Sequence, residues 1–223
     1  MSVSTSRIKG ASAATAYEVL HRDIMLLRLA PGTVLDESSL SARLSMSRAP
    51  LREALIRLNC DGLVISLPNR SSMVAALELA SLPGFFDAFS IMLRMSARLA
   101  AERQSGSSAI TEALAAYVRA CAKTTAVEPA LAVLTLQGHI ANAGRNQHFI
   151  SFSGRLMAQA VRLLVASGAV ISARCLERLV VAVTSGRADV ADEAAAFVVA
   201  EFRSLIMGWL STDAAIGVDL TKG

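Results

Sequence analysis

Residues that build catalytic and metal sites are scarce in this sequence. Its 223 residues include three His and three Cys, and Cys60, Cys121 and Cys175 lie far apart, without the spacing of a metal site or a disulfide framework. Glycine-rich phosphate loops, nucleophile elbows and His-Glu-x-x-His motifs are also missing. We therefore do not expect an enzyme, and isolated thiols of this kind are typical of the reducing cytoplasm.

Aromatic residues and long apolar runs are scarce too. Aromatics make up 4% of the chain, which argues against a protein that stacks the bases of single-stranded nucleic acid. Apolar residues make up 53%, yet no uninterrupted apolar run reaches the length of about 18 residues that a membrane span needs. Residues 1–10 are Ser-rich without an apolar core, unlike a secretory signal. The net charge of +4 permits nucleic-acid binding without requiring it.

The pattern of the chain changes near residue 78. Before that point, helical segments are followed by two short strand-like segments; after it, helical periodicity dominates. The predicted fold is mainly α, an N-terminal winged helix-turn-helix with a small β-hairpin wing, followed by an all-helical bundle. We expect a DNA-binding domain over residues 1–78, a helical effector-binding or dimerisation domain over 79–212, and a flexible tail over 213–223.

The first domain is predicted from its periodicity and its breaks. An amphipathic helix covers Ala14–Leu29 and stops before Pro31-Gly32. A second helix, capped by Asp36 or Ser38, carries Leu40 and Leu44, and a third begins at Ser47 and ends at Asp61-Gly62. Val34 and Leu35 form a brief extended entry. Two strands follow, at Leu63–Ser66 and Ser72–Ala75.

The second domain is predicted as about six helices separated by Gly, Ser, Asn and Glu-containing breaks. Their expected ranges are Leu82–Arg103, Ser108–Lys123, Pro129–Ala143, Asn146–Ala166, Ser172–Ser185 and Ala188–Leu210.

The third predicted helix carries the clearest functional signal. Arg48 and Arg52 are four residues apart and share its polar face, close to its N-terminus. The N-terminal residues of a recognition helix meet the base edges of the DNA major groove. Arginine can pair with guanine in bidentate fashion or grip phosphate. The alternative is an amphipathic helix with two solvated arginines, but a preceding turn and a following wing favour DNA.

The same segments resemble the GntR family of bacterial transcriptional regulators. The resemblance runs through Ala30–Glu37, Leu40–Leu44, Ser47–Leu55, Asp61–Val64 and Pro68–Arg70. It implies that the DNA contacts are Ser38, Ser47, Arg48, Ala49, Arg52, Asn69 and Arg70, the last two on the wing. Ala49 replaces a hydroxyl residue common in the family, which removes one hydrogen bond to phosphate.

The helical remainder, with Ala97–Ala101 and Gly144–Asn146, resembles the FadR-type C-terminal domain called FCD. Many such domains bind a divalent metal through an Asp and three His, two of them in the pattern Asp-x-x-x-His. That pattern falls on Thr135 and His139, and the other two His positions fall near Leu176 and Val198. A metal needs three or four nitrogen or oxygen ligands. We therefore predict no metal and no other cofactor, and His139 is either a bundle residue or a polar contact for an effector.

The segment Phe85–Met95 is rich in Phe and Met. It forms core or a dimer interface in one interpretation, and one wall of an apolar effector pocket in the other. The predicted pocket residues are Phe89, Leu93, Thr135, His139, Leu176 and Val198, and the expected effector is hydrophobic or aromatic.

These expectations combine into a cytoplasmic homodimer that binds a double-stranded DNA operator, and not a membrane. A repressor relieved by a small effector is the leading hypothesis. A constitutive DNA-binding regulator, whose helical domain only dimerises, is the alternative.

Overall fold

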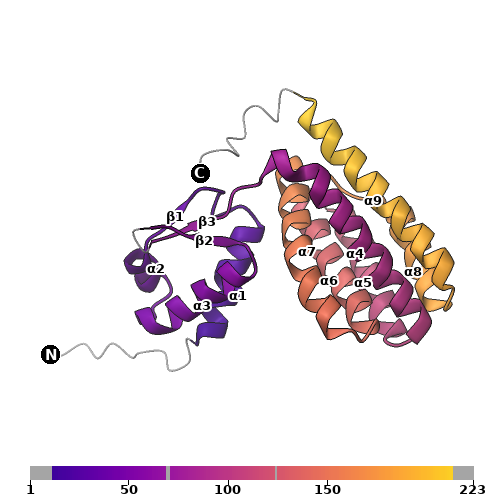
Figure 1. The fold of residues 1–223 in the computed structure, drawn as a ribbon, viewed down its shortest axis with the longest axis horizontal. Helices are drawn as coiled ribbons and strands as arrows, with labels where there is room; N and C mark the ends of the chain where they lie inside the picture. Colours follow the sequence, from indigo (N-terminus) through magenta and orange to yellow (C-terminus); the bar gives the residue numbers. More distant parts are fainter. Residues whose placement is uncertain (1–11, 69–70, 124, 213–223) are drawn as a thin grey trace. The chain divides into compact units, whose positions relative to one another are not determined.

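The computed structural model describes residues 12–68, 71–123 and 125–212 (Figure 1). Cα packing divides the chain between Ala76 and Leu77 into two units, which are described separately here. The predicted tail at 213–223 and the predicted wing contacts Asn69 and Arg70 lie outside the described residues. The predicted fold class is confirmed, with a helix-turn-helix and a small antiparallel sheet in the first unit and helices in the second.

The described residues of the first unit form three helices and a small sheet. In chain order these are α1 (Ala13–Met25), β1 (Val34–Leu35), α2 (Glu37–Arg43), α3 (Arg48–Cys60), β2 (Val64–Ser66) and β3 (Ser72–Val74). The side chain of Ser12 caps α1, and that of Asp36 caps α2 by accepting a 2.7 Å hydrogen bond from the Ser39 amide. Asp36, rather than Ser38, is therefore the cap of the second helix.

The sheet has one strand more than the predicted hairpin. Its order is β1-β3-β2, and Val34 and Leu35 pair with Met73 and Ser72 of β3. Leu35 is buried while Val34 is exposed, which is the alternation of a strand with one face on a core. A two-residue segment carries too little pattern to be recognised as a strand before its partner is known.

The predicted end of the first helix at Leu29 is wrong. Leu27 has a positive φ of 54°, and the amides of Arg28 and Leu29 both donate to the carbonyl of Asp23. The helix therefore ends at Met25, one turn earlier than the Pro31-Gly32 signal indicates. The leucines beyond Met25 continue the apolar periodicity without continuing the helix.

A compact core holds α1 against α3. Leu20 and Ile24 of α1 and Leu51 and Leu58 of α3 are fully buried, and full burial of such a side chain contributes about 1.5–3 kcal/mol. The buried residues of α3 occupy one face of the helix, whereas Arg48 and Arg52 lie beside that face and are exposed.

The second unit begins with a short 3₁₀ turn, η1 (Leu79–Ser81), and continues with six α-helices in the described range 77–212. They are α4 (Leu82–Arg103), α5 (Ser107–Cys121), α6 (Val127–Ala143), α7 (Gln147–Ser167), α8 (Ala173–Thr184) and α9 (Ala188–Leu210). The predicted ranges agree with these within two residues at each end. η1 was not predicted.

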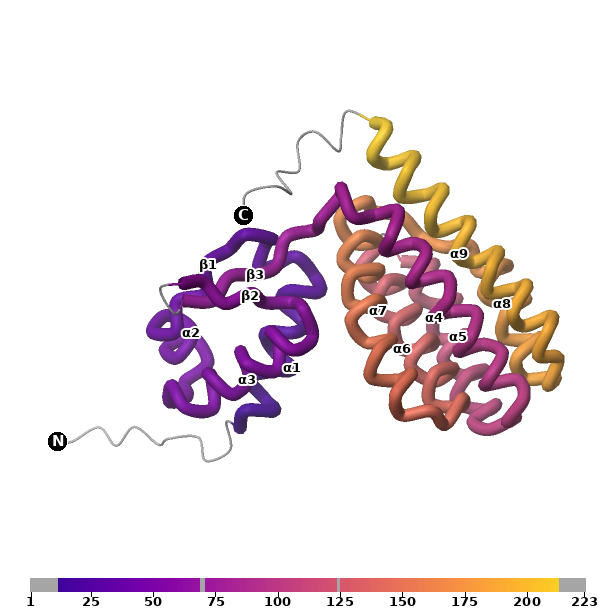
Figure 2. The backbone as a smooth tube through the Cα atoms, in the orientation of Figure 1, coloured from indigo at the N-terminus to yellow at the C-terminus, as the bar shows by residue number. Residues whose placement is uncertain are grey.

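Helix α4 packs along α9, α5 packs on α6, and α8 packs on α9 (Figures 1 and 2). Two ion pairs between exposed side chains flank the first of these contacts, Arg94 with Asp192 at 2.6 Å and Arg98 with Asp189 at 2.7 Å. Such surface pairs contribute little stability, so the apolar residues between the helices hold the bundle together.

One helix of the bundle, α7, is long and apolar enough to cross a membrane by length and composition alone, and 44% of its apolar window is buried inside the structure. It packs against α4, α6 and α9. Its buried residues include Arg162, whose pKa burial lowers to about 10. Core helices of globular bundles commonly have this composition.

Candidate nucleic-acid interface and helical-domain cavity

Helix α3 begins at an exposed N-terminus. Ser47 occupies the N-cap with extended backbone dihedrals, and its side chain makes no capping hydrogen bond to a described residue. Ser47, Arg48 and Ala49 are all exposed. The first N–H groups of a helix carry partial positive charge and have no intrahelical acceptor, so this end of α3 offers donors to an anion.

The two arginines project from the exposed side of α3 and are each held by α2. Arg48 donates from Nη2 to the hydroxyl of Ser38 at 3.2 Å. Arg52 donates from Nε to both carboxylate oxygens of Glu37, at 3.1 and 2.9 Å. Ser38 and Arg48, both of which we expect to contact DNA, are thus in contact with each other.

Glu37 is the residue of this surface that the sequence did not indicate. It stands in the first turn of α2, where acidic residues are favoured by the helix dipole, so its presence there has an ordinary local explanation. Its contact with Arg52 depends on how α2 packs against α3, which brings together two side chains that are 15 residues apart in the sequence.

The connection between β2 and β3 closes tightly. The amide of Leu67 donates to the carbonyl of Ser71 at 2.9 Å, and Ser66 pairs with Ser72 in the sheet. The two wing strands are therefore joined by a short connection, and the predicted wing contacts Asn69 and Arg70 fall in the part of it that lies outside the described residues.

A polar cluster ties α1 to the C-terminal end of α3. Tyr17 donates its hydroxyl to Asp61 at 2.8 Å, and the guanidinium of Arg57 lies 4.2 Å from the centre of the Tyr17 ring. Burial, followed by the hydrogen bond to Asp61, raises the pKa of Tyr17 to about 12. Burial lowers the pKa of the neighbouring His21. The cluster fixes the end of α3 opposite to the one with the two arginines.

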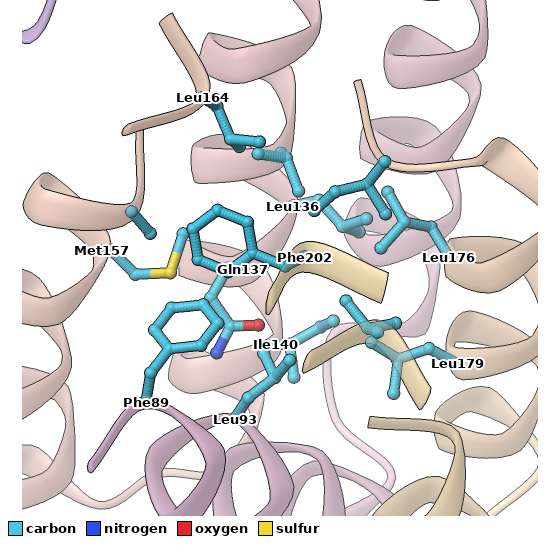
Figure 3. A pocket seen from close by; sticks show the side chains of 14 residues that line it. Phe89, Leu93, Leu136, Gln137, Ile140, Met157, Leu164, Leu176, Leu179 and Phe202 are labelled. Atoms are coloured by element: carbon cyan, nitrogen blue, oxygen red, sulfur yellow. The ribbon is translucent and has the colours of Figure 1, made fainter. Parts of the chain in front are cut away.

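The helical unit contains an apolar cavity between α4, α6, α7, α8 and α9 (Figure 3). Its volume is about 20 Å³, close to the minimum that a single water molecule requires. Among the described residues that line it, Gln137 has the one polar side chain apart from the thioether of Met157, and it is 4% exposed. Its Nε2 donates a weak 3.6 Å hydrogen bond to the sulfur of Met92. Figure 3 shows the amide extending into the cavity beside the ring of Phe89.

Four of the predicted pocket residues line this cavity, namely Phe89, Leu93, Leu176 and Val198.

The placement of Thr135 and His139 in the pocket is wrong. Thr135 is exposed and donates its hydroxyl to the carbonyl of Leu131, and His139 is half-buried outside the lining. The residues of α6 that line the cavity form two pairs four residues apart, Val133 with Gln137 and Leu136 with Ile140. Thr135 and His139 are each two residues from Gln137, which is about 200° of helix rotation. The predicted register on this helix was therefore displaced.

The cavity does not fit the divalent metal that the FCD resemblance implies. Such a metal takes three or four nitrogen, oxygen or thiolate ligands. The lining offers a single amide and no carboxylate, imidazole or thiol. Within the described residues, no group of three His, Cys, Asp or Glu side chains is placed to hold a metal ion.

The first unit is similar to known proteins in sequence. Residues 12–74 match the family model of the bacterial regulatory proteins of the gntR family. The chain is 44% identical over 64 residues to the HTH-type transcriptional repressor RspR of Escherichia coli K12, a match that covers 29% of this chain and 28% of that protein. It is 34% identical over 73 residues to the Nta operon transcriptional regulator of Aminobacter aminovorans, covering 33% and 35%. The match thus spans about a third or less of these relatives, over the winged helix.

Similarity to solved structures extends over both units. E. coli McbR/YncC has a TM-score of 0.76 at 17% identity, covering 88% of this chain and 97% of that one. A GntR protein from Rhodococcus sp. RHA1 has a TM-score of 0.72 at 16% identity, with the same coverage of each chain. At these identities the likeness shows a shared fold, a winged helix followed by a helical bundle.

Proposed function

We propose that this chain, whose residues 12–74 form a winged helix of the GntR family, is a DNA-binding transcriptional regulator. The observation that carries the proposal is the exposed surface of α3. Arg48 and Arg52 lie one turn apart near its N-terminus and are exposed, while another face of the helix is buried in the core. A helix presented in this way fits the major groove, with arginine donors available for guanine.

Each surface residue has a proposed role. Arg48 and Arg52 contact base edges, and the N-terminus of α3 at Ser47 and Ala49 receives a backbone phosphate. Ser38 positions Arg48 through its hydroxyl and is a second candidate contact to DNA. Asn69 and Arg70, outside the described residues, are proposed for the neighbouring backbone or minor groove.

Selection of duplexes from a random DNA library by the full-length protein tests this function. A consensus should emerge from the wild type. Arg52→Ala should then weaken binding to the consensus by about 1–3 kcal/mol and relax the preference at one base pair. Arg119→Ala, which removes an exposed arginine from α5, is the matched control and should preserve both. Failure of the wild type to enrich any sequence would refute the proposal.

We also infer that the regulator is a cytoplasmic homodimer on a two-fold symmetric operator. The helical unit leaves large apolar side chains exposed, including Ile91, Val181 and Phe197, and such exposure is typical of surfaces that become buried on association. A closed dimer places two recognition helices about one helical turn of DNA apart. Sedimentation velocity gives the mass, and the spacing of half-sites in the selected consensus gives the symmetry.

For the helical domain we propose a small apolar or aromatic effector, whose binding releases the operator. The support is a cavity with an apolar wall and one amide, a composition typical of small-molecule sites. Because the cavity holds about one water, an effector must favour a more open state, and this differential affinity is what would change DNA binding.

A constitutive regulator, whose helical domain only dimerises, is the second candidate. The small volume of the cavity favours it, since a well-packed core needs no ligand. Thermal melting with a library of aromatic acids and apolar molecules separates the two. An effector should raise the melting temperature of the wild type and change its affinity for the selected operator. It should have no effect on Ala160→Val, whose added methyl groups take up the free volume of the cavity. If no compound shifts the wild type, the constitutive reading stands.

A further inference from the structure

The carboxylate of Glu37 holds the guanidinium of Arg52 in one orientation. The side chain of Arg52 is 63% exposed and that of Glu37 is 27% exposed. Glu37 is therefore the more fixed partner, set in the first turn of a helix that Asp36 caps and that packs on α3. Both contacts come from Nε, so the carboxylate grips the arginine at the base of its guanidinium group.

The contact with Glu37 leaves a defined set of Arg52 N–H donors for other partners. A guanidinium has five N–H groups, one on Nε and two on each Nη. With Nε directed at Glu37, the four Nη hydrogens stay outside the ion pair, at the tip of the side chain. Two of them suffice for a bidentate contact to O6 and N7 of guanine. The Glu37 contact therefore suits an end-on approach of Arg52 to a base and opposes a side-on approach through Nε.

The charge of Glu37 acts on the same arginine. A carboxylate beside Arg52 offsets part of its positive charge, which lowers the attraction of that side chain for any phosphate. Attraction to phosphates supplies most of non-specific DNA binding. Hydrogen bonds to a base edge depend on direction as well as on charge and are less affected.

We propose that Glu37 is a specificity-determining residue that positions Arg52 for base recognition and keeps it from binding phosphates of unrelated DNA. This proposal rests on the proposed function as a DNA-binding regulator. It assigns to α2 a role in selecting sequence, although Glu37 itself cannot hydrogen-bond to a phosphate, because both groups are anionic acceptors.

Two substitutions separate positioning from charge. Glu37→Gln keeps an oxygen that can accept from Nε but removes the charge, and Glu37→Ala removes both. Each is measured alone and combined with Arg52→Ala. Glu18→Ala, which removes an exposed carboxylate from α1 of the same domain, is the control for a general change in charge. Circular dichroism melting verifies that each variant is folded.

Binding is measured by fluorescence anisotropy with the duplex selected by the wild type and with a scrambled duplex of equal composition, over a series of salt concentrations. Glu37→Gln should bind the scrambled duplex about three- to tenfold more tightly at low salt, with the slope of log K against log salt steeper by about 0.9. Glu37→Ala should lower the ratio of selected to scrambled affinity by at least about tenfold, the effect of one lost base contact. In the Arg52→Ala background, neither substitution should change the ratio by more than about twofold, since the coupling has been removed.

The inference is overturned if the ratio for Glu37→Ala stays within twofold of the wild type. It is also overturned if the loss persists without Arg52, or if Glu18→Ala produces the same loss. In each of these cases the wild type still selects a sequence, so the proposed function survives. A wild type that selects no sequence removes the proposed function, and the role of Glu37 with it.

Discussion

Replacing Gln137 with Leu should stabilise the helical domain. The amide is buried in an apolar cavity, and among the residues that the structure describes its hydrogen bond goes to a thioether sulfur, a weak acceptor. A buried amide with little compensation costs about 1–3 kcal/mol in protein mutational data. The leucine side chain is shorter than that of glutamine but has a similar volume, and it is apolar like the residues that line the cavity. We therefore expect the free energy of unfolding to rise by about 1–2 kcal/mol.

The single tryptophan allows the free energy of unfolding to be measured for the helical domain alone. Trp209 lies on α9 in the helical unit, so its fluorescence during urea unfolding reports that unit alone. Each kcal/mol gained in the free energy of unfolding also raises the melting temperature by roughly 2–4 °C. Gln159→Leu, on α7 and outside the cavity lining, is the control and should change stability by less than half as much.

A loss of stability of 1 kcal/mol or more in Gln137→Leu would refute the reasoning. It would mean that the amide is well satisfied and belongs to the core. A gain would mean instead that a destabilising polar group is kept at this position, which is common where a group serves binding. Under the proposed effector function, the same substitution should also abolish the thermal shift produced by a ligand that hydrogen-bonds the amide.

Three further predictions concern stability. Tyr17→Phe should lower the stability of the N-terminal domain by about 1–2 kcal/mol, because Asp61 loses its donor; circular dichroism should show the loss while Trp209 fluorescence is unchanged. His21 has a lowered pKa in the folded domain, so the unfolded chain binds its proton more readily and stability should fall as the pH drops below 6.5; melting curves of His21→Leu should show a weaker dependence. Gly186 has a φ of +71°, so Gly186→Ala should cost about 1 kcal/mol in urea titrations, and adding Gln104→Ala, which clears the space for the new methyl group, should recover only a small part.

Much of the fold could be predicted from helix-breaking residues in the sequence. The predicted bounds of α4 and α9 coincide with the observed ones, and the glycine break at Gly186 lies two residues before the start of α9. The end of α1 could not be found in this way. It depends on the positive φ of Leu27, a residue with no intrinsic preference for that conformation, and the apolar pattern continues past it.

The candidate sites could be predicted where side chains act from one helix. Arg48 and Arg52 lie on the exposed face of α3 as their spacing indicates, and Phe89 and Leu93 line the cavity from α4. Contacts between side chains of different helices were harder to predict from the sequence. The partnership of Glu37 with Arg52 depends on how α2 crosses α3, which no local pattern encodes.

The size of the cavity and the aromatic packing around it together constrain how any ligand could act. A molecule larger than water must displace lining side chains, and two of these are Phe89 and Phe202, whose ring centres lie 5.3 Å apart. Phe89 is in turn 5.5 Å from Phe85, and Phe202 is 5.4 Å from Phe86. Packed interiors transmit such displacements because they contain little free volume. Phe85 and Phe86 stand in the first turn and a half of α4, where the chain enters the bundle from the winged helix. We therefore expect an effector that displaces Phe89 or Phe202 to shift the start of α4 as well.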